Sequence, residues 1–276
     1  MGGLIALLIA LATPQFGFSR TADVPFMPGV RGTLDVYTPR RPNPGAPVVV
    51  FLYGGNWDSG EKALYRFVGA SLARAGVVTV IPDYRVYPEV RFPGFLEDNA
   101  RAVRWAKDHA ASFGADPDRL FLIGHSAGAY DVAMLTLDPR WLAAVGMEPR
   151  RDVRGAIGLS GPYDFLPLES SELKVIFGPP ERLSGTQPIN HVSGAAPPML
   201  LMAGGADRTV DPGNSARLQG RITASGGRAE LVIFPKARHA DTITALLPVF
   251  GGGLDVGGRI RRFIEAQSPV AAGPAA

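Results

Sequence analysis

The chain has 276 residues, a length that favours one large α/β domain over two small ones. With 46% hydrophobic and 19% charged residues it does not have the composition of a disordered chain, and the absence of cysteine excludes disulfides and a thiolate nucleophile. The formal charge is +3, but the basic residues are spread along the sequence, so we expect no nucleic-acid partner.

The N-terminal stretch "MGGLIALLIALATPQF" carries an apolar run from Leu4 to Ala12. This run is too short to span a bilayer, but it resembles the apolar core of a signal peptide, with Ala10-Leu11-Ala12 as a candidate cleavage site. No Lys or Arg precedes it, so a signal peptide, a membrane tether and a plain apolar helix all stay open. We treat residues 1–22 as a separate segment and favour export or membrane tethering over a cytoplasmic location.

Short β-rich runs then alternate with helical patterns, which predicts a parallel sheet with crossover helices. The stretch "TLDVY" (33–37) alternates and indicates an early strand, while the apolar runs 47–54 and 77–84 indicate strands buried on both faces. Between these two runs, apolar residues at helical spacing predict a helix over 63–75 that ends at Gly76.

The centre of the chain holds the first chemical motif. A helix predicted over 94–113 is followed by a buried strand, "DRLFLIGHS", and the sequence "AGAYDVAMLTL" predicts a helix directly after it. At the junction, "GHSAG" fits the G-x-S-x-G nucleophile elbow, in which a strand turns sharply into a helix and exposes a serine hydroxyl. Ser126 is therefore the predicted nucleophile.

Three further strands are predicted over 153–160, 199–204 and 230–234, before a closing helix that ends near residue 266. The segment 162–198 is rich in Pro, Ser and Gly and predicts a small cap over the carboxyl-terminal edge of the sheet. We therefore expect one α/β domain over 23–266, with a mostly parallel central sheet, helices on both faces and this cap. Residues 267–276 are expected to form a flexible tail.

A serine hydroxyl becomes a good nucleophile only when an imidazole takes its proton and a carboxylate orients that imidazole. Of the four histidines, His239 is best placed, because it follows the last strand at the edge where the elbow lies. The others are His109 in a helix, His191 in the cap and His125 in the elbow, which we expect to face away from the serine.

Two aspartates compete for the role of the acid. Asp207 follows the strand 199–204 directly and is the first choice, whereas Asp211 lies a few residues further on and is the alternative. The order Ser126, Asp207, His239 is the chain order of α/β-hydrolases and differs from the orders in chymotrypsin and subtilisin.

Acyl transfer also needs hydrogen-bond donors where the oxyanion develops. One donor should be the backbone N–H of Ala127, directly after the serine. The loop "YGGNW" (53–57) should supply Gly55 and Asn56, because the consecutive glycines let its backbone bend into the site. The candidate walls of a substrate pocket are Trp57, Tyr130, Phe165 and Leu166. For each of them, a place in the hydrophobic core is an equal alternative.

Together, "YGGNWDSGEK", "PDYRVYPEVRFP", "DRLFLIGHSAGA", "GGADRTV" and "RHAD" resemble the α/β-hydrolase carboxylesterases with an HGGGW-like oxyanion loop. This group includes hormone-sensitive-lipase-like, feruloyl-esterase-like and kynurenine-formamidase-like enzymes, and the resemblance covers about 34–264. It implies an α/β-hydrolase fold, a Ser126–His239–Asp207 triad, and oxyanion donors at Gly55, Asn56 and Ala127.

The resemblance also implies that Arg85 and Glu89, in "DYRVYPE", lie behind the site and are structural. The chain departs from the family at Tyr53, where many members have His, and at Asn56, where many have Gly; Asn56 could therefore donate through its side chain as well.

We therefore expect a serine esterase that cleaves small-molecule carboxylic esters through an acyl-enzyme, without a metal or organic cofactor. An arylformamidase-type amide hydrolase is the nearest alternative, because the same triad cleaves a formyl amide. A catalytically inactive hydrolase fold that serves as a binding protein is the alternative from another class. The acyl and alcohol groups and the oligomeric state stay open.

Overall fold

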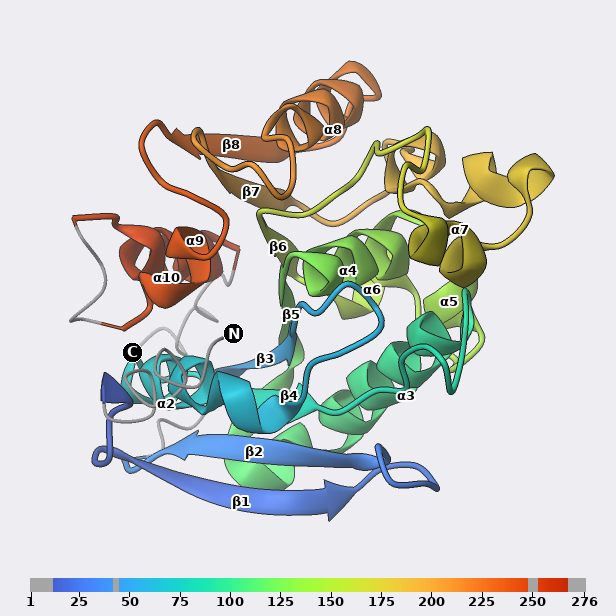
Figure 1. Cartoon of the computed structure of the whole chain (residues 1–276). Helices are drawn as coiled ribbons and strands as arrows, with labels where there is room; N and C mark the ends of the chain where they lie inside the picture. The colour runs from blue at the N-terminus through green and yellow to red at the C-terminus, as the bar shows by residue number, and fades with distance from the viewer. Residues whose placement is uncertain (1–11, 42–44, 248–252, 268–276) are drawn as a thin grey trace.

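The computed structural model describes residues 12–41, 45–247 and 253–267. A single sheet of eight strands crosses the molecule in the order β1-β2-β4-β3-β5-β6-β7-β8 (Figure 1). Only the pairs β1–β2 and β2–β4 are antiparallel. The strands are β1 (Phe18–Pro25), β2 (Thr33–Pro39), β3 (Ala46–Leu52), β4 (Val78–Pro82), β5 (Ala115–His125), β6 (Gly155–Leu159), β7 (Met199–Gly204) and β8 (Ala229–Phe234).

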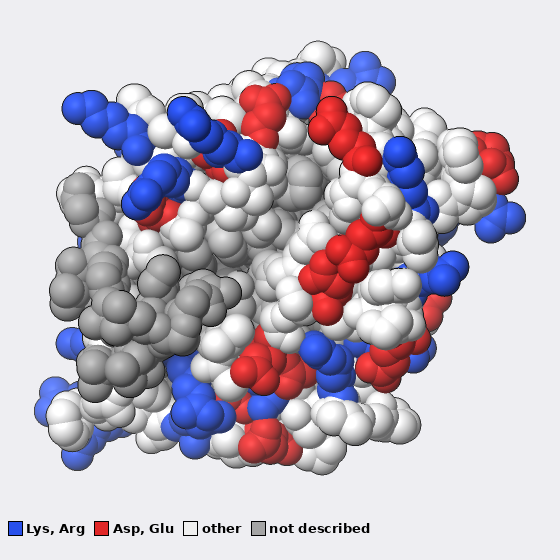
Figure 2. Space-filling model, in the orientation of Figure 1, with Lys and Arg blue, Asp and Glu red and all other residues white. Residues whose placement is uncertain are grey.

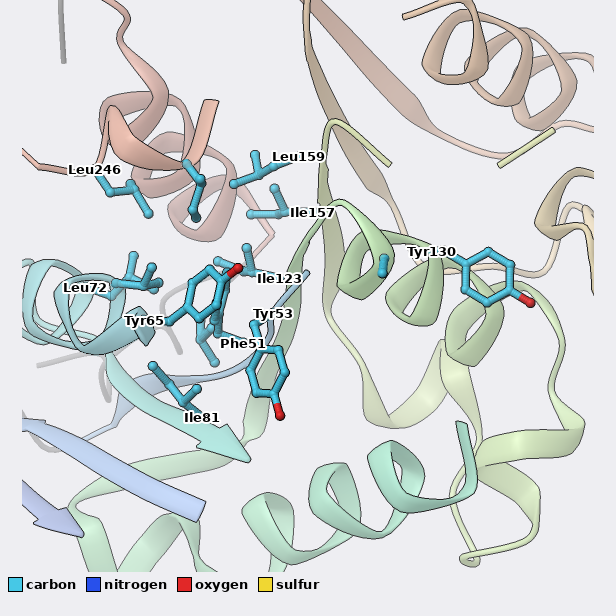
Figure 3. Packing of buried hydrophobic residues seen from close by; sticks show 14 of the residues in the cluster. Phe51, Tyr53, Tyr65, Leu72, Ile81, Ile123, Tyr130, Ile157, Leu159 and Leu246 are labelled. Carbon is cyan, nitrogen blue, oxygen red and sulfur yellow. The ribbon is translucent and has the colours of Figure 1, made fainter. Parts of the chain in front are cut away.

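Helices cover both faces of the sheet (Figure 1). One face of the sheet, which includes Val49 and Phe51 of β3, packs against α2 (Arg66–Arg74) and α10 (Val256–Ala266). The other face, which includes Val48 and Val50, packs against α3 (Gly94–His109), α4 (Ala127–Leu137) and α8 (Gly213–Ala224). Figure 3 shows the first of these layers, where Phe51 and its neighbours on the sheet meet Tyr65, Leu72 and Leu246. Because side chains of a strand alternate, continuous apolar runs fill both layers. The prediction of a mostly parallel sheet between helices is confirmed.

The first strand was not predicted, and it crosses the boundary expected between residues 22 and 23. β1 pairs with β2 alone and is exposed along most of its length, so it carries no apolar run in its sequence, "FSRTADVP". The ordered domain therefore includes residues on both sides of that boundary. The apolar run from Leu4 lies almost wholly in residues 1–11, outside the described residues, and within the described ranges no helix is long and apolar enough to cross a membrane.

The predicted cap lies between β6 and β7. It contains α7 (Ser171–Phe177) and two short 3-10 helices, η3 (Pro180–Thr186) and η4 (Pro188–His191). The cap is held to α4 by the Tyr130 hydroxyl, which donates to the Thr186 carbonyl at 2.8 Å. Two aromatic rings of the cap, Phe165 and Phe177, pack against Trp57 in the loop after β3. One side of the site is thus walled by a segment with little regular structure.

Candidate active site

Ser126 lies at the turn between β5 and α4, with φ 56° and ψ −123°. This backbone conformation is unfavourable for a residue with a side chain, and it presents the hydroxyl above the end of the strand. A Cβ on Gly128 would overlap the Leu52 carbonyl of β3, so only glycine lets the helix approach the sheet this closely. The local geometry is that of the elbow predicted from "GHSAG".

A chain of two hydrogen bonds joins Ser126 to the histidine and the aspartate expected beside it. His239 Nε2 lies 2.9 Å from Ser126 Oγ, and His239 Nδ1 lies 2.7 Å from Asp207 Oδ2. The three residues follow β5, β7 and β8, whose carboxyl ends meet at one edge of the parallel sheet. Residues 113 and 32 positions apart in sequence thereby come into contact. We call Ser126, His239 and Asp207 the candidate triad.

The two aspartates have different surroundings. The side chain of Asp207 is 0% exposed, and its Oδ1 accepts from the backbone N–H groups of Thr209 and Val210, at 2.8 and 3.0 Å. Asp211 has a side chain 65% exposed, and it accepts from the Gly213 N–H, at the start of α8. Asp207 is thus oriented for His239, whereas Asp211 holds the first N–H of α8 and pairs with Arg217.

The structure shows what the side chain of His125 contacts. Its ring packs beside that of His239, with centroids 5.0 Å apart, and its Nε2–H donates to the His239 backbone carbonyl at 3.2 Å. Its Nδ1 is buried and has no hydrogen-bond partner among the described residues. Burial lowers the pKa of His125 to about 3, and the neighbouring His239 adds to this effect. His125 is therefore a neutral support of the loop that carries His239.

Replacing His125 by glutamine should reduce the loss of stability in acid. The unfolded histidine has a pKa near 6.5 and the folded one near 3, so the unfolded state binds more protons between these values. The contribution of His125 to the free energy of unfolding is therefore fully present above pH 6.5 and is lost as the pH falls toward 3. About 3 kcal/mol of it is lost near pH 4. Urea unfolding of wild type and His125→Gln at pH 7.5 and 4.5 measures the difference, and parallel losses in the two proteins would contradict it.

The loop after β3 places its backbone beside the serine. A Cβ on Gly54 would lie 2.8 Å from Ser126 Cβ, so the loop passes directly over the elbow. Within the described part of the chain, the backbone N–H groups of Gly55, Asn56 and Ala127 have no hydrogen-bond acceptor. The Asn56 side chain turns away and donates to Asp58 Oδ2 at 3.0 Å. Asn56 therefore offers the site its backbone N–H and not its amide.

Tyr53, which stands where many family members have His, lies beneath this loop. Its ring is stacked between Tyr65 and Tyr84, with centroids 5.5 and 4.6 Å away. Its hydroxyl donates to Asp83 Oδ1 at 3.0 Å, and burial raises its pKa. Tyr53 thus supports the loop from behind and does not contribute to the wall of the cavity.

The two family residues expected behind the site also lie away from it. Arg85 forms a bidentate ion pair with the buried Asp98 of α3, with N–O distances of 2.8 and 2.7 Å, and Glu89 is exposed. This pair joins the loop after β4 to α3.

A cavity of about 880 Å³ opens in front of the candidate triad. Three of the four predicted wall residues line it, Trp57, Phe165 and Leu166, whereas Tyr130 is buried in α4 with its hydroxyl turned to the cap (Figure 3). On the coloured part of the face in Figure 2, acidic and basic side chains are interspersed, without a continuous track of one sign. The lining of the cavity is mainly apolar, with Asp164, Glu169, Asp211 and Arg217 as its charged residues.

Known esterases have sequences related to this chain. The model of the BD-FAE family matches residues 34–222. An isoprenylcysteine alpha-carbonyl methylesterase of Arabidopsis thaliana is 28% identical over 232 residues, which cover 76% of this chain and 54% of the relative. The esterase LipC of Mycobacterium tuberculosis is 31% identical over 225 residues, which cover 75% and 56%. The chain spans about half the length of these curated relatives.

Solved structures share the architecture. Esterase B from Lactobacillus rhamnosis matches with a TM-score of 0.80 at 19% identity, over 96% of this chain and 93% of that chain. The apo form of Thermogutta terrifontis esterase 2 matches with a TM-score of 0.68 at 25% identity, over 92% and 93%.

Proposed function

Because the chain belongs to the BD-FAE family and has the α/β-hydrolase fold, we propose that it is a serine carboxylesterase acting on small-molecule esters through an acyl-enzyme. The observation that carries the proposal is the unbroken line of hydrogen bonds from Ser126 through His239 to Asp207, facing an apolar cavity. The presence of all three residues in contact argues against an inactive hydrolase fold.

In the first half of the proposed reaction, Ser126 Oγ attacks the ester carbonyl while its proton passes to His239 Nε2. The Asp207 carboxylate holds the Nδ1–H of His239 and stabilises the imidazolium that forms. Negative charge develops on the carbonyl oxygen, to which the N–H groups of Gly55, Asn56 and Ala127, without an acceptor among the described residues, can donate. The intermediate then breaks the bond to the alcohol, which leaves with the proton from His239.

In the second half, water enters the place of the alcohol and gives its proton to His239 as it attacks the acyl carbonyl. The tetrahedral intermediate collapses, Ser126 recovers its proton, and the acid departs. Every step uses the same donors and the same base, so the residues named above suffice for both halves.

A panel of p-nitrophenyl esters of increasing acyl length, with N-formylkynurenine beside them, tests the proposal. We expect ester hydrolysis, since relatives named esterases share the matched region. Turnover of the formamide, but of none of the esters, would instead establish the arylformamidase alternative. A folded protein that cleaves neither class would contradict the proposed function.

A further inference from the structure

One buried carboxyl group takes no part in the chemistry proposed above. Asp131 lies on α4, one helical turn after Ala127, and is 0% exposed. Its Oδ1 accepts from the Trp57 indole Nε1–H at 3.1 Å, and its Oδ2 accepts from the Asn99 amide of α3 at 3.0 Å. Among the described residues it has no ion pair with Lys, Arg or His. A carboxyl group without a counter-ion is costly to bury, so its contacts require an explanation.

The contact to Trp57 reaches the loop that carries two of the oxyanion donors. Asn56 and Trp57 both have left-handed backbone conformations, with φ 55° and 59°. Such conformations persist in residues with side chains only where the surroundings impose them. The Trp57 carbonyl accepts from the Tyr87 N–H at 2.7 Å, and the indole ring packs edge-on against Tyr130 and Phe177. The bond to Asp131 is the polar part of this anchor.

We propose that Asp131 is a positioning residue: by holding the Trp57 indole, it fixes the loop that carries Gly55 and Asn56 against the helix that carries Ala127. This inference rests on the proposed esterase function. The oxyanion donors come from two separate elements, and they act together only if both lie at hydrogen-bond distance from one oxygen atom. The Trp57–Asp131 bond joins those two elements directly.

The chemistry of the carboxyl group suggests a conservative replacement. Burial raises the pKa of Asp131, and the buried Asn99 Oδ1 has no hydrogen-bond partner in the described part of the chain. If the Asn99 amide is turned over, a neutral Asp131 donates its O–H to that oxygen and still accepts from Trp57. An asparagine side chain can make the same pair of hydrogen bonds, whereas leucine has a similar volume and can make neither.

The test compares Asp131→Leu, Trp57→Phe and the double variant in hydrolysis of a p-nitrophenyl ester. For Asp131→Leu we expect kcat to fall by about 10- to 100-fold while KM stays within about threefold, because the lost interaction acts in the transition state. The double variant should lose no more than about threefold beyond the more affected single variant, since both changes remove the same bond.

Two controls separate positioning from general damage to α4. In Asp131→Asn, kcat should stay within about threefold of wild type. Thr136→Val removes another buried polar group of α4, whose hydroxyl donates to the Val132 carbonyl at 2.8 Å, and should leave kcat unchanged. Wild-type kcat in Asp131→Leu, a rise in KM alone, or equal losses in Asp131→Leu and Asp131→Asn would each overturn the proposal.

A second readout does not depend on esterase activity. The Trp57 indole N–H signal in a ¹H–¹⁵N spectrum is identified by its loss in Trp57→Phe. We expect this proton to exchange slowly in wild type and rapidly in Asp131→Leu; equal exchange in the two would overturn the proposed anchor. If wild type cleaves no ester but this difference in exchange is found, the proposed function is wrong, whereas the proposed anchor of the loop is still supported.

Discussion

Replacing Ser126 by alanine is expected to abolish ester hydrolysis, with kcat lowered by roughly 10⁵- to 10⁶-fold. The hydroxyl is the atom that would form the acyl-enzyme, and His239 Nε2 lies 2.9 Å from it. Alanine leaves His239 and the oxyanion donors in place, so only the weak reaction with water remains. Initial rates with a p-nitrophenyl ester, at matched circular dichroism spectra, measure the loss.

A matched control is Ser71→Ala on α2, which removes a part-buried hydroxyl that donates to the Leu246 carbonyl. This variant should keep wild-type kcat. A p-nitrophenyl phosphonate should label wild type at Ser126 and leave Ser126→Ala unlabelled, as read by mass spectrometry of peptides. If Ser126→Ala retained more than about a tenth of the activity, another group would have to be the nucleophile.

Changing Asp207 to asparagine should lower kcat by about 10³- to 10⁴-fold, whereas Asp211→Asn should stay within about threefold of wild type. The asparagine amide can present an N–H to His239 Nδ1, which then holds the imidazole in the tautomer that cannot accept the serine proton. Asp211 is exposed and accepts from the Gly213 N–H at the start of α8, a hydrogen bond that an asparagine oxygen can accept as well.

The measurement is kcat for both variants between pH 6 and 9, beside wild type. Equal losses of kcat in the two variants would show that the Asp207–His239 contact does not identify the acid of the triad. A loss confined to Asp211→Asn would transfer the role to the residue held as the alternative. Unfolding midpoints in urea, measured on the same preparations, show whether either change acts through stability instead.

Much of the site could be predicted because its parts carry local signals. The elbow needs a strand, a helix and two close glycines, all within "DRLFLIGHSAGAYDVAMLTL", and each leaves a pattern in the sequence. His239 and Asp207 were found because parallel strands end at one edge, so that a residue directly after a buried strand is near the others. The same reasoning placed Asp207 ahead of Asp211, four positions further on, but only the structure shows which of the two side chains turns inward to His239.

The contacts of His125 show a second limit of prediction from the sequence. Its place next to Ser126 in sequence indicated only that it alternates away from the serine, whereas its ring turns to the loop of His239, 114 positions away. No periodic pattern encodes that contact. Similarly, β1 has a polar sequence because it forms the edge of the sheet, and its pairing with β2 is set by backbone hydrogen bonds that most residues can form.

The sequence by itself therefore determined the order of the buried strands, the elbow at Ser126 and the chain order of the candidate triad, because burial on both faces and a tight turn restrict which residues are allowed. Only the tertiary structure decided which polar groups meet: Asp207 with His239, His125 with the His239 carbonyl, and Asp131 with Trp57. These contacts join residues from distant elements, and they exist only where packing has already brought those elements within hydrogen-bond distance.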